Sequence, residues 1–99
     1  MHIALAPFRL KPGVSEDDLR RTSDDFEEQF VQKQEGILKR ILVRDGKGGY
    51  ADIVFFADAA AIDRVIEAEQ TSEVCAAFFA IMDSDGTHKV YEMLKTYER

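Results

Sequence analysis

The chain has 99 residues, which suits one domain and is too short for two. Acidic residues outnumber basic ones by 19 to 13, and this balance excludes the clustered positive charge of a nucleic-acid-binding protein. Hydrophobic residues make up 45% of the chain, too many for a disordered protein, yet no apolar run approaches the roughly 20 residues of a membrane span. Its single cysteine, Cys75, excludes an internal disulfide. We therefore expect one cytoplasmic domain, residues 1–99, with no membrane segment.

The first half of the chain predicts a strand, a helix and a hairpin. The apolar run over residues 2–10 predicts a strand that stops before Pro12-Gly13. Ser15 is a suitable N-cap, and apolar residues at helical spacing then predict a helix over residues 15–34. Residues 37–44 and 50–57 resemble strands, and the five residues between them include three glycines. This spacing predicts a β-hairpin.

The second half predicts a broken helix and a last strand. Asp58 is placed to cap a helix, Gln70-Thr71-Ser72 interrupts the helical period, and residues 88–97 form a final strand. The resulting order, β-α-β-β-α-β, is typical of the ferredoxin-like α+β fold. That fold has one four-stranded antiparallel sheet, with the first and third strands in the middle and both helices on one face.

The strands lack the alternation of a sheet that has one wet face. Residues 3–8 carry no charge, and residues 50–57 carry only Asp52. Both faces of the sheet are therefore expected to be shielded from water, although the helices cover only one. A second copy of the sheet is the simplest cover, so we expect a homodimer. We expect Val54 and Leu42 on the face that the second copy covers.

Several segments carry a family resemblance that extends over nearly the whole chain. They are Lys11-Pro12-Gly13, Glu35-Gly36-Ile37-Leu38, and the run from Tyr50 to Phe56 that leads into Ala59-Ala60-Ala61. With these segments the chain resembles the dimeric α+β barrel superfamily, in its antibiotic-biosynthesis-monooxygenase-like branch. The resemblance implies a ferredoxin-like domain that pairs as a dimeric α+β barrel.

The resemblance also implies an activity, but the chain lacks two residue types that are typical of the active relatives. Relatives oxidise aromatic polyketides without metal or flavin, or bind haem and open its ring. Their polar machinery typically includes Asn and Trp, and this chain has neither; Phe56 stands near the usual place of a Trp. The haem-degrading relatives carry a His on the second helix, whereas His2 and His88 lie outside it.

Asp52 is the only charge within its strand. In a symmetric hairpin Leu42 faces Asp52, and Arg40 and Arg44 flank it diagonally on the same face. Two such arginines would lower the pKa of Asp52. Either this group is a structural ion pair at the rim of a dimer interface, or it anchors a bound acid or quinone.

Aromatic side chains are numerous for so small a domain. Most belong to the core, but helices and sheet of this fold can part to leave an apolar cleft for a small organic ligand. The predicted ligand-binding residues are Asp52, Arg40, Arg44, Tyr50, Phe56 and Phe78.

Other reactive side chains predict no further chemistry. Cys75 lies among small and apolar residues and is expected to be a buried thiol. His2 and His88 stand at opposite places in the predicted sheet and are expected to have surface or turn roles. With no carboxylate–histidine cluster, phosphate loop or dinucleotide fingerprint, we expect no metal and no tightly bound cofactor.

Two functions remain open. One is a small homodimer that binds, and as an enzyme oxidises, a small aromatic or otherwise apolar metabolite. The other is a non-catalytic ligand-binding or stress-associated barrel module that lacks the catalytic groups of the family.

Overall fold

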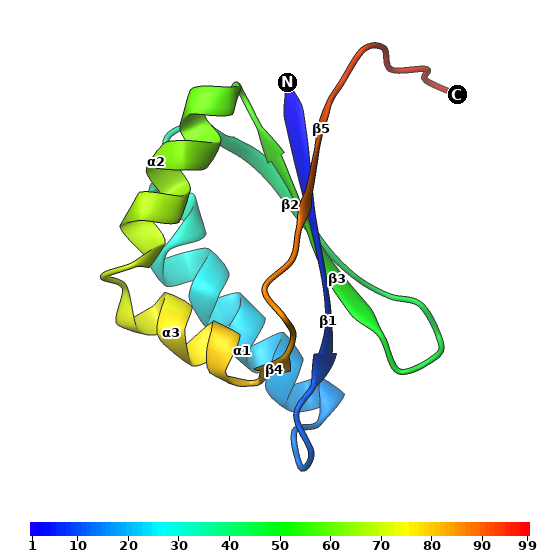
Figure 1. Ribbon diagram of the computed structural model, residues 1–99, viewed down its shortest axis with the longest axis vertical. Coiled ribbons are helices and arrows are strands. Elements are labelled where there is room, and N and C mark those ends of the chain that lie inside the picture. Colours follow the sequence, from blue (N-terminus) through cyan, green and yellow to red (C-terminus); the bar gives the residue numbers. More distant parts are fainter.

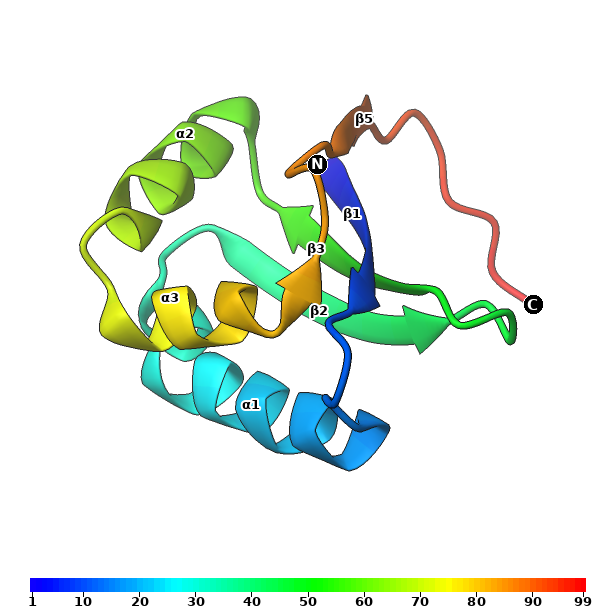
Figure 2. The same cartoon turned by 60° about the horizontal axis from the view of Figure 1, so that its bottom comes forward.

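One antiparallel sheet and three helices make up the computed structural model, which describes residues 1–99. The elements are β1 (His2–Leu10), α1 (Glu16–Gln29), the 3₁₀ turn η1 (Val31–Lys33), β2 (Ile37–Arg44), β3 (Tyr50–Phe56), α2 (Ala59–Glu69), α3 (Glu73–Ala80), β4 (Met82–Asp83) and β5 (Lys89–Glu92). The helices cover one face of the sheet and leave the other without a covering layer (Figure 1 and Figure 2). This arrangement confirms the predicted ferredoxin-like α+β fold.

The sheet follows the predicted strand order, with β1 and β3 in the middle and β2 outside β3. Two short strands, β4 and β5, share the other edge of β1 in place of one strand over residues 88–97. A tight turn separates them, because the Asp85 carboxylate accepts hydrogen bonds from both the backbone N–H and the hydroxyl of Thr87. Residues 84–88 therefore leave the edge of β1 between the two strands.

The first helix begins as predicted and ends early. Ser15 Oγ accepts from the Asp18 N–H at 3.0 Å, and the Asp18 carboxylate accepts from the Ser15 N–H at 2.9 Å, which forms a capping box. The helix ends at Gln29, five residues before its predicted limit. Phe30 and Val31, which follow the helix, are both buried, and the chain tightens there into the 3₁₀ turn η1.

The second helical region breaks where the sequence predicts. Asp58 Oδ1 accepts from the Ala61 N–H at 2.8 Å and caps α2, and Ser72 Oγ accepts from the Cys75 N–H at 3.2 Å and caps α3. Cys75 is fully buried beside Phe78, as expected, and burial raises the pKa of its thiol. The fold thus uses this thiol as a small core side chain.

The strand register decides which side chains face the helices. Asp52 pairs with Leu42 and Tyr50 with Arg44, as the symmetric hairpin predicts. Leu42 and Val54, however, pack against the buried core, so the prediction that they lie on the uncovered face is wrong. Because successive side chains of a strand point to opposite faces, the uncovered face carries their neighbours. It includes the paired apolar side chains Ile3, Leu5, Ile41, Val43, Ile53 and Phe55, none of which is buried. Lys39 lies on the same face, with its ammonium 5.5 Å from the ring centre of Phe55.

Candidate functional site

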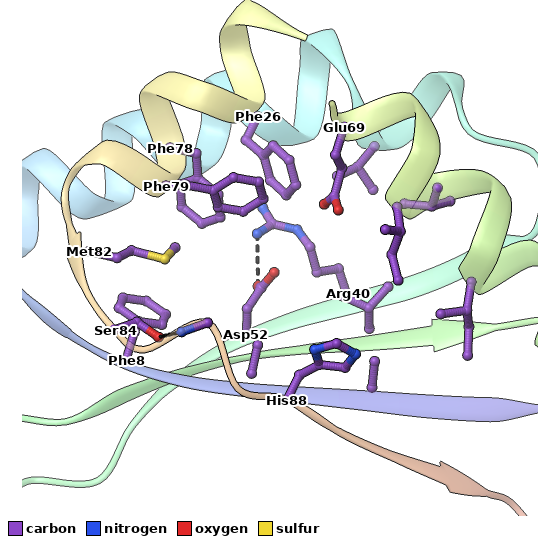
Figure 3. A pocket seen from close by; sticks show the side chains of 18 of the residues that line it. Phe8, Phe26, Arg40, Asp52, Glu69, Phe78, Phe79, Met82, Ser84 and His88 are labelled. Atoms are coloured by element: carbon purple, nitrogen blue, oxygen red, sulfur yellow. Dashed lines mark hydrogen bonds and ion pairs between the residues drawn. The ribbon is translucent and has the colours of Figure 1, made fainter. Parts of the chain in front are cut away.

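A cavity of about 420 Å³ lies between the helices and the sheet (Figure 3). Hydrophobic residues supply 15 of the 23 that line it. On its sheet side β1 contributes Ala4 and Ala6, whose methyl groups leave room that larger side chains would fill. Its size and apolar walls suit a small organic molecule.

Arg40 is the cation of this cavity, and the protein holds it on every side. Its Nε donates to Glu27 at 3.0 Å, Nη1 donates to Asp52 at 2.9 Å, and Nη2 donates to the carbonyl and hydroxyl oxygens of Ser23. The guanidinium carbon lies 5.0 Å from the ring centre of Phe26 and 5.7 Å from that of Phe78. Four of its five N–H groups are therefore used within the protein.

Asp52 projects from β3 into the centre of the cavity (Figure 3). One carboxylate oxygen, Oδ1, accepts from Arg40, and Oδ2 accepts no hydrogen bond from the protein. Burial raises the pKa of the carboxyl above its usual value, and the attraction of Arg40 offsets only part of that effect. The expectation that flanking arginines lower this pKa is therefore wrong in direction.

Two further titratable side chains line the cavity, and the sequence reasoning missed both. Glu69, the last residue of α2, points its carboxylate inward beside Phe26 and Arg40 (Figure 3). Partial burial, together with the nearby charge of Asp52, raises its pKa from 4.5 to about 7. His88 enters from the other side, on residues 84–88 (Figure 3). His88 is exposed and lies between two strands, in agreement with its predicted surface or turn role, but the sequence did not predict that it lines a cavity.

The cavity brings together four of the six predicted site residues, Arg40, Asp52, Phe56 and Phe78. Arg44 and Tyr50 lie outside it, toward the hairpin. Arg44 Nη1 donates to both carboxylate oxygens of Glu16 at 2.9 Å, and the Tyr50 hydroxyl donates to the same carboxylate at 3.2 Å. The register places Arg44 diagonally from Asp52, as predicted, but its guanidinium pairs with Glu16 at the capped start of α1 and not with Asp52.

The remaining polar groups do not assemble into a metal centre. The structure has no group of three or more His, Cys, Asp or Glu side chains able to hold a metal ion. His2 lies in β1 opposite Phe56, outside the cavity, with a buried Nδ1 that has no partner. None of the helices is long and apolar enough to span a membrane.

Comparison with solved structures places the fold among the antibiotic biosynthesis monooxygenases. One protein of that description superposes with a TM-score of 0.73 at 22% identity, over 96% of this chain and all of the other. SnoaB, a cofactor-independent oxygenase from Streptomyces nogalater, superposes with a TM-score of 0.77 at 17% identity, over 99% of this chain and 97% of its own. A related protein from Caulobacter crescentus gives 0.71 at 14% identity, covering 95% and 90%.

Similarity at the level of sequence is weaker. No family model matches the chain, and no curated protein matches it. The resemblance stated from the sequence is confirmed as a shared fold, since all these structures are less than 25% identical to the chain. What the site does must come from its own residues.

Proposed function

We propose that the protein binds a small aromatic metabolite in the cavity between helices and sheet, and that it oxidises this metabolite with dioxygen without a tightly bound cofactor. The observation that carries the proposal is the cavity itself, which has a volume of about 420 Å³ and a mostly hydrophobic lining. Its polar side chains are two carboxyl groups, an arginine, a histidine, a serine and a threonine. The rings of Phe26, Phe78 and Phe79 pack against one another and line the cavity, so they offer aromatic surface to a planar ring system. The likeness to SnoaB, a cofactor-independent oxygenase, supports oxygen chemistry in this fold.

The proposed reaction needs only the substrate, dioxygen and a group that moves protons. A ring methylene gives up two C–H bonds and becomes a carbonyl; one oxygen atom of dioxygen enters the carbonyl and the other leaves as water. Electrons come from the substrate, so neither flavin nor metal is required. Glu69, whose pKa is raised to about 7, suits the proton transfers, because it exchanges protons near neutral pH.

The second part of the proposal is a homodimer that covers the open face of the sheet. Six apolar side chains of three adjacent strands lie on that face without a covering layer: Ile3, Leu5, Ile41, Val43, Ile53 and Phe55. Contiguous apolar surface of this kind is uncommon on a monomer and is typical of an interface. Sedimentation at micromolar concentration should therefore give twice the mass of the chain, and a monomeric mass would contradict the dimer.

Oxygen uptake tests the enzymatic proposal. The purified protein would be mixed with hydroquinones and with anthrone-like ring ketones, and oxygen consumption would be followed beside a thermal-shift measurement of binding. We expect at least one compound both to raise the melting temperature and to consume oxygen above the uncatalysed rate. Asp52→Asn serves as the comparison variant, because it keeps the shape of the side chain and removes its charge.

A non-catalytic binding module is the second candidate, and one observation favours it. The chain has no Asn and no Trp, which the resemblance associates with catalysis. Under this alternative the same compounds would raise the melting temperature, yet oxygen consumption would stay at the uncatalysed rate throughout the panel.

A further inference from the structure

The charges around the cavity restrict what it can bind, if the cavity is the ligand site proposed above. Arg40 is its one arginine, and three carboxyl groups surround it or face it: Glu27, Asp52 and Glu69. The arginine can offer a ligand at most one N–H group, on Nη1, because the other four donate to Glu27, Asp52 and Ser23. A carboxylate ligand would therefore meet more negative charge than positive charge, with few donors to hold it.

The cavity is, by contrast, rich in acceptors. Asp52 Oδ2 accepts no hydrogen bond from the protein, and the Glu69 carboxylate takes part in no ion pair or side-chain hydrogen bond. These groups come from β3 and from the end of α2, so they face the cavity from two of its walls (Figure 3). Neither carboxylate has a buried oxygen without a partner, so water reaches these acceptors, and a ligand that donates hydrogen bonds would take the place of that water.

We propose that the ligand is a neutral hydroxyl-bearing aromatic compound, and that Glu69 is the group that accepts its hydroxyl proton. The Glu69 carboxylate first accepts a hydrogen bond from the hydroxyl group. In turnover the proton moves to the Glu69 oxygen, and its bonding electron pair stays on the ligand oxygen as a phenolate. Dioxygen then oxidises the electron-rich phenolate at its ring methylene: two C–H bonds are replaced by a carbonyl, one oxygen atom enters that carbonyl, and the other leaves as water. The proton on Glu69 returns to the ligand oxygen, which restores both the hydroxyl and the carboxylate. Asp52 is a second acceptor for the ligand, because Arg40 holds its carboxylate in one orientation through Oδ1 and leaves Oδ2 free to accept.

Glu69 stands apart from the other acids of the cavity in its charge environment. Arg40 on β2 binds Asp52 on β3 and Glu27 on α1, and it makes no ion pair with Glu69. His88, on the segment between β4 and β5, is the other titratable group at the cavity wall. Partial burial and the charge of Asp52 raise the pKa of Glu69 to about 7. The fraction of Glu69 that is ionised, and can accept a proton, therefore increases as the pH rises through 7. The proposal thus predicts a pH dependence that belongs to Glu69.

Three naphthalene probes test this inference by calorimetry, without any need for turnover. A naphthol donates a hydrogen bond, its methyl ether has the same ring but no donor, and the corresponding naphthoate carries a negative charge. We expect the naphthol to bind about tenfold or more tightly than either of the others above neutral pH. This advantage over the ether should shrink as the pH falls to about 5.5, where Glu69 is protonated.

Variants assign the effect to one side chain. Glu69→Gln should bind the ether as the unaltered protein does and lose the pH-dependent advantage of the naphthol. Glu67→Gln, two residues away and exposed, is the matched control and should change neither property. His88→Gln should keep the pH dependence; if it abolishes that dependence instead, His88 is the acceptor and the inference is overturned.

Failure of the inference differs from failure of the proposed function. Equal affinity for the naphthol and its ether, or tightest binding of the naphthoate, would overturn the inference while leaving a working ligand site. If none of the three probes binds even at millimolar concentration, the ligand site itself is contradicted.

Discussion

Removal of the Arg40 side chain is the sharpest test of how the cavity is held together. Its side chain is only 7% exposed, and that of Asp52 is 11% exposed. Arg40→Met keeps an unbranched apolar stem in place but leaves Asp52 without its cation and Ser23 without its donors. Breaking a buried pair by removing one partner costs about 3–5 kcal/mol, because the remaining charge is left uncompensated. For a domain of this size such a loss lowers the melting temperature by roughly 15 °C or more.

The opposite truncation should be milder. In Asp52→Ala the guanidinium keeps Glu27 and both oxygens of Ser23, so about 1–2 kcal/mol is lost. The two truncations differ because the guanidinium has three other acceptors, whereas the carboxylate has only one protein donor. The double variant Arg40→Met/Asp52→Ala should be more stable than Arg40→Met alone, since it no longer contains the unpaired carboxylate.

The effect of Arg40→Met should also depend on pH. Burial already raises the pKa of Asp52 above 3.8, and loss of the arginine would raise it further. A buried acid with a raised pKa binds more protons in the native state than in the unfolded state, so its contribution to stability falls as the pH rises. The variant should therefore lose more stability at pH ~8 than at pH ~5.

Urea unfolding followed by circular dichroism measures all three variants at both pH values. Equal destabilisation by Arg40→Met and Asp52→Ala would refute the reasoning. A cost below about 1 kcal/mol for Arg40→Met would do the same, because that is the range of exposed ion pairs.

Three other predictions concern the uncovered face of the sheet, Glu69, and Ala6 on the sheet side of the cavity. Ile53→Lys places a charge on the proposed dimer face and should give monomers in sedimentation, whereas Ala60→Lys, on an exposed position of α2, should leave the dimer intact. The melting temperature should fall between about pH 4.5 and 7, where native Glu69 is still protonated and unfolded Glu69 is ionised; Glu69→Gln should reduce this fall, and an unchanged pH profile would contradict the raised pKa. Ala6→Leu should fill the cavity and weaken naphthol binding about tenfold or more without a large loss of stability, and undiminished binding would place the ligand elsewhere.

Local signals in the sequence determined the elements and much of their pairing. The three helices are capped at their N-termini by the side chains of Ser15, Asp58 and Ser72. These caps can be predicted from the sequence, because a capping side chain bonds to the backbone of the few residues that follow it. The glycine-rich turn set the register of the hairpin, and that register placed Asp52 opposite Leu42 and within reach of Arg40. The strand order and the helical layer follow from the same pattern.

Tertiary structure alone decided which groups share the cavity. Both faces of the strands are apolar, so alternation gave no sign that Val54 and Leu42 face the helices. Arg44 joins Glu16, an acid 28 residues away in sequence, because α1 starts beside the hairpin. Glu69 and His88 lie at the end of a helix and in a turn, where periodicity does not predict direction. Their positions, and the raised pKa of Glu69, arise from burial among elements distant in the chain, which no local pattern encodes.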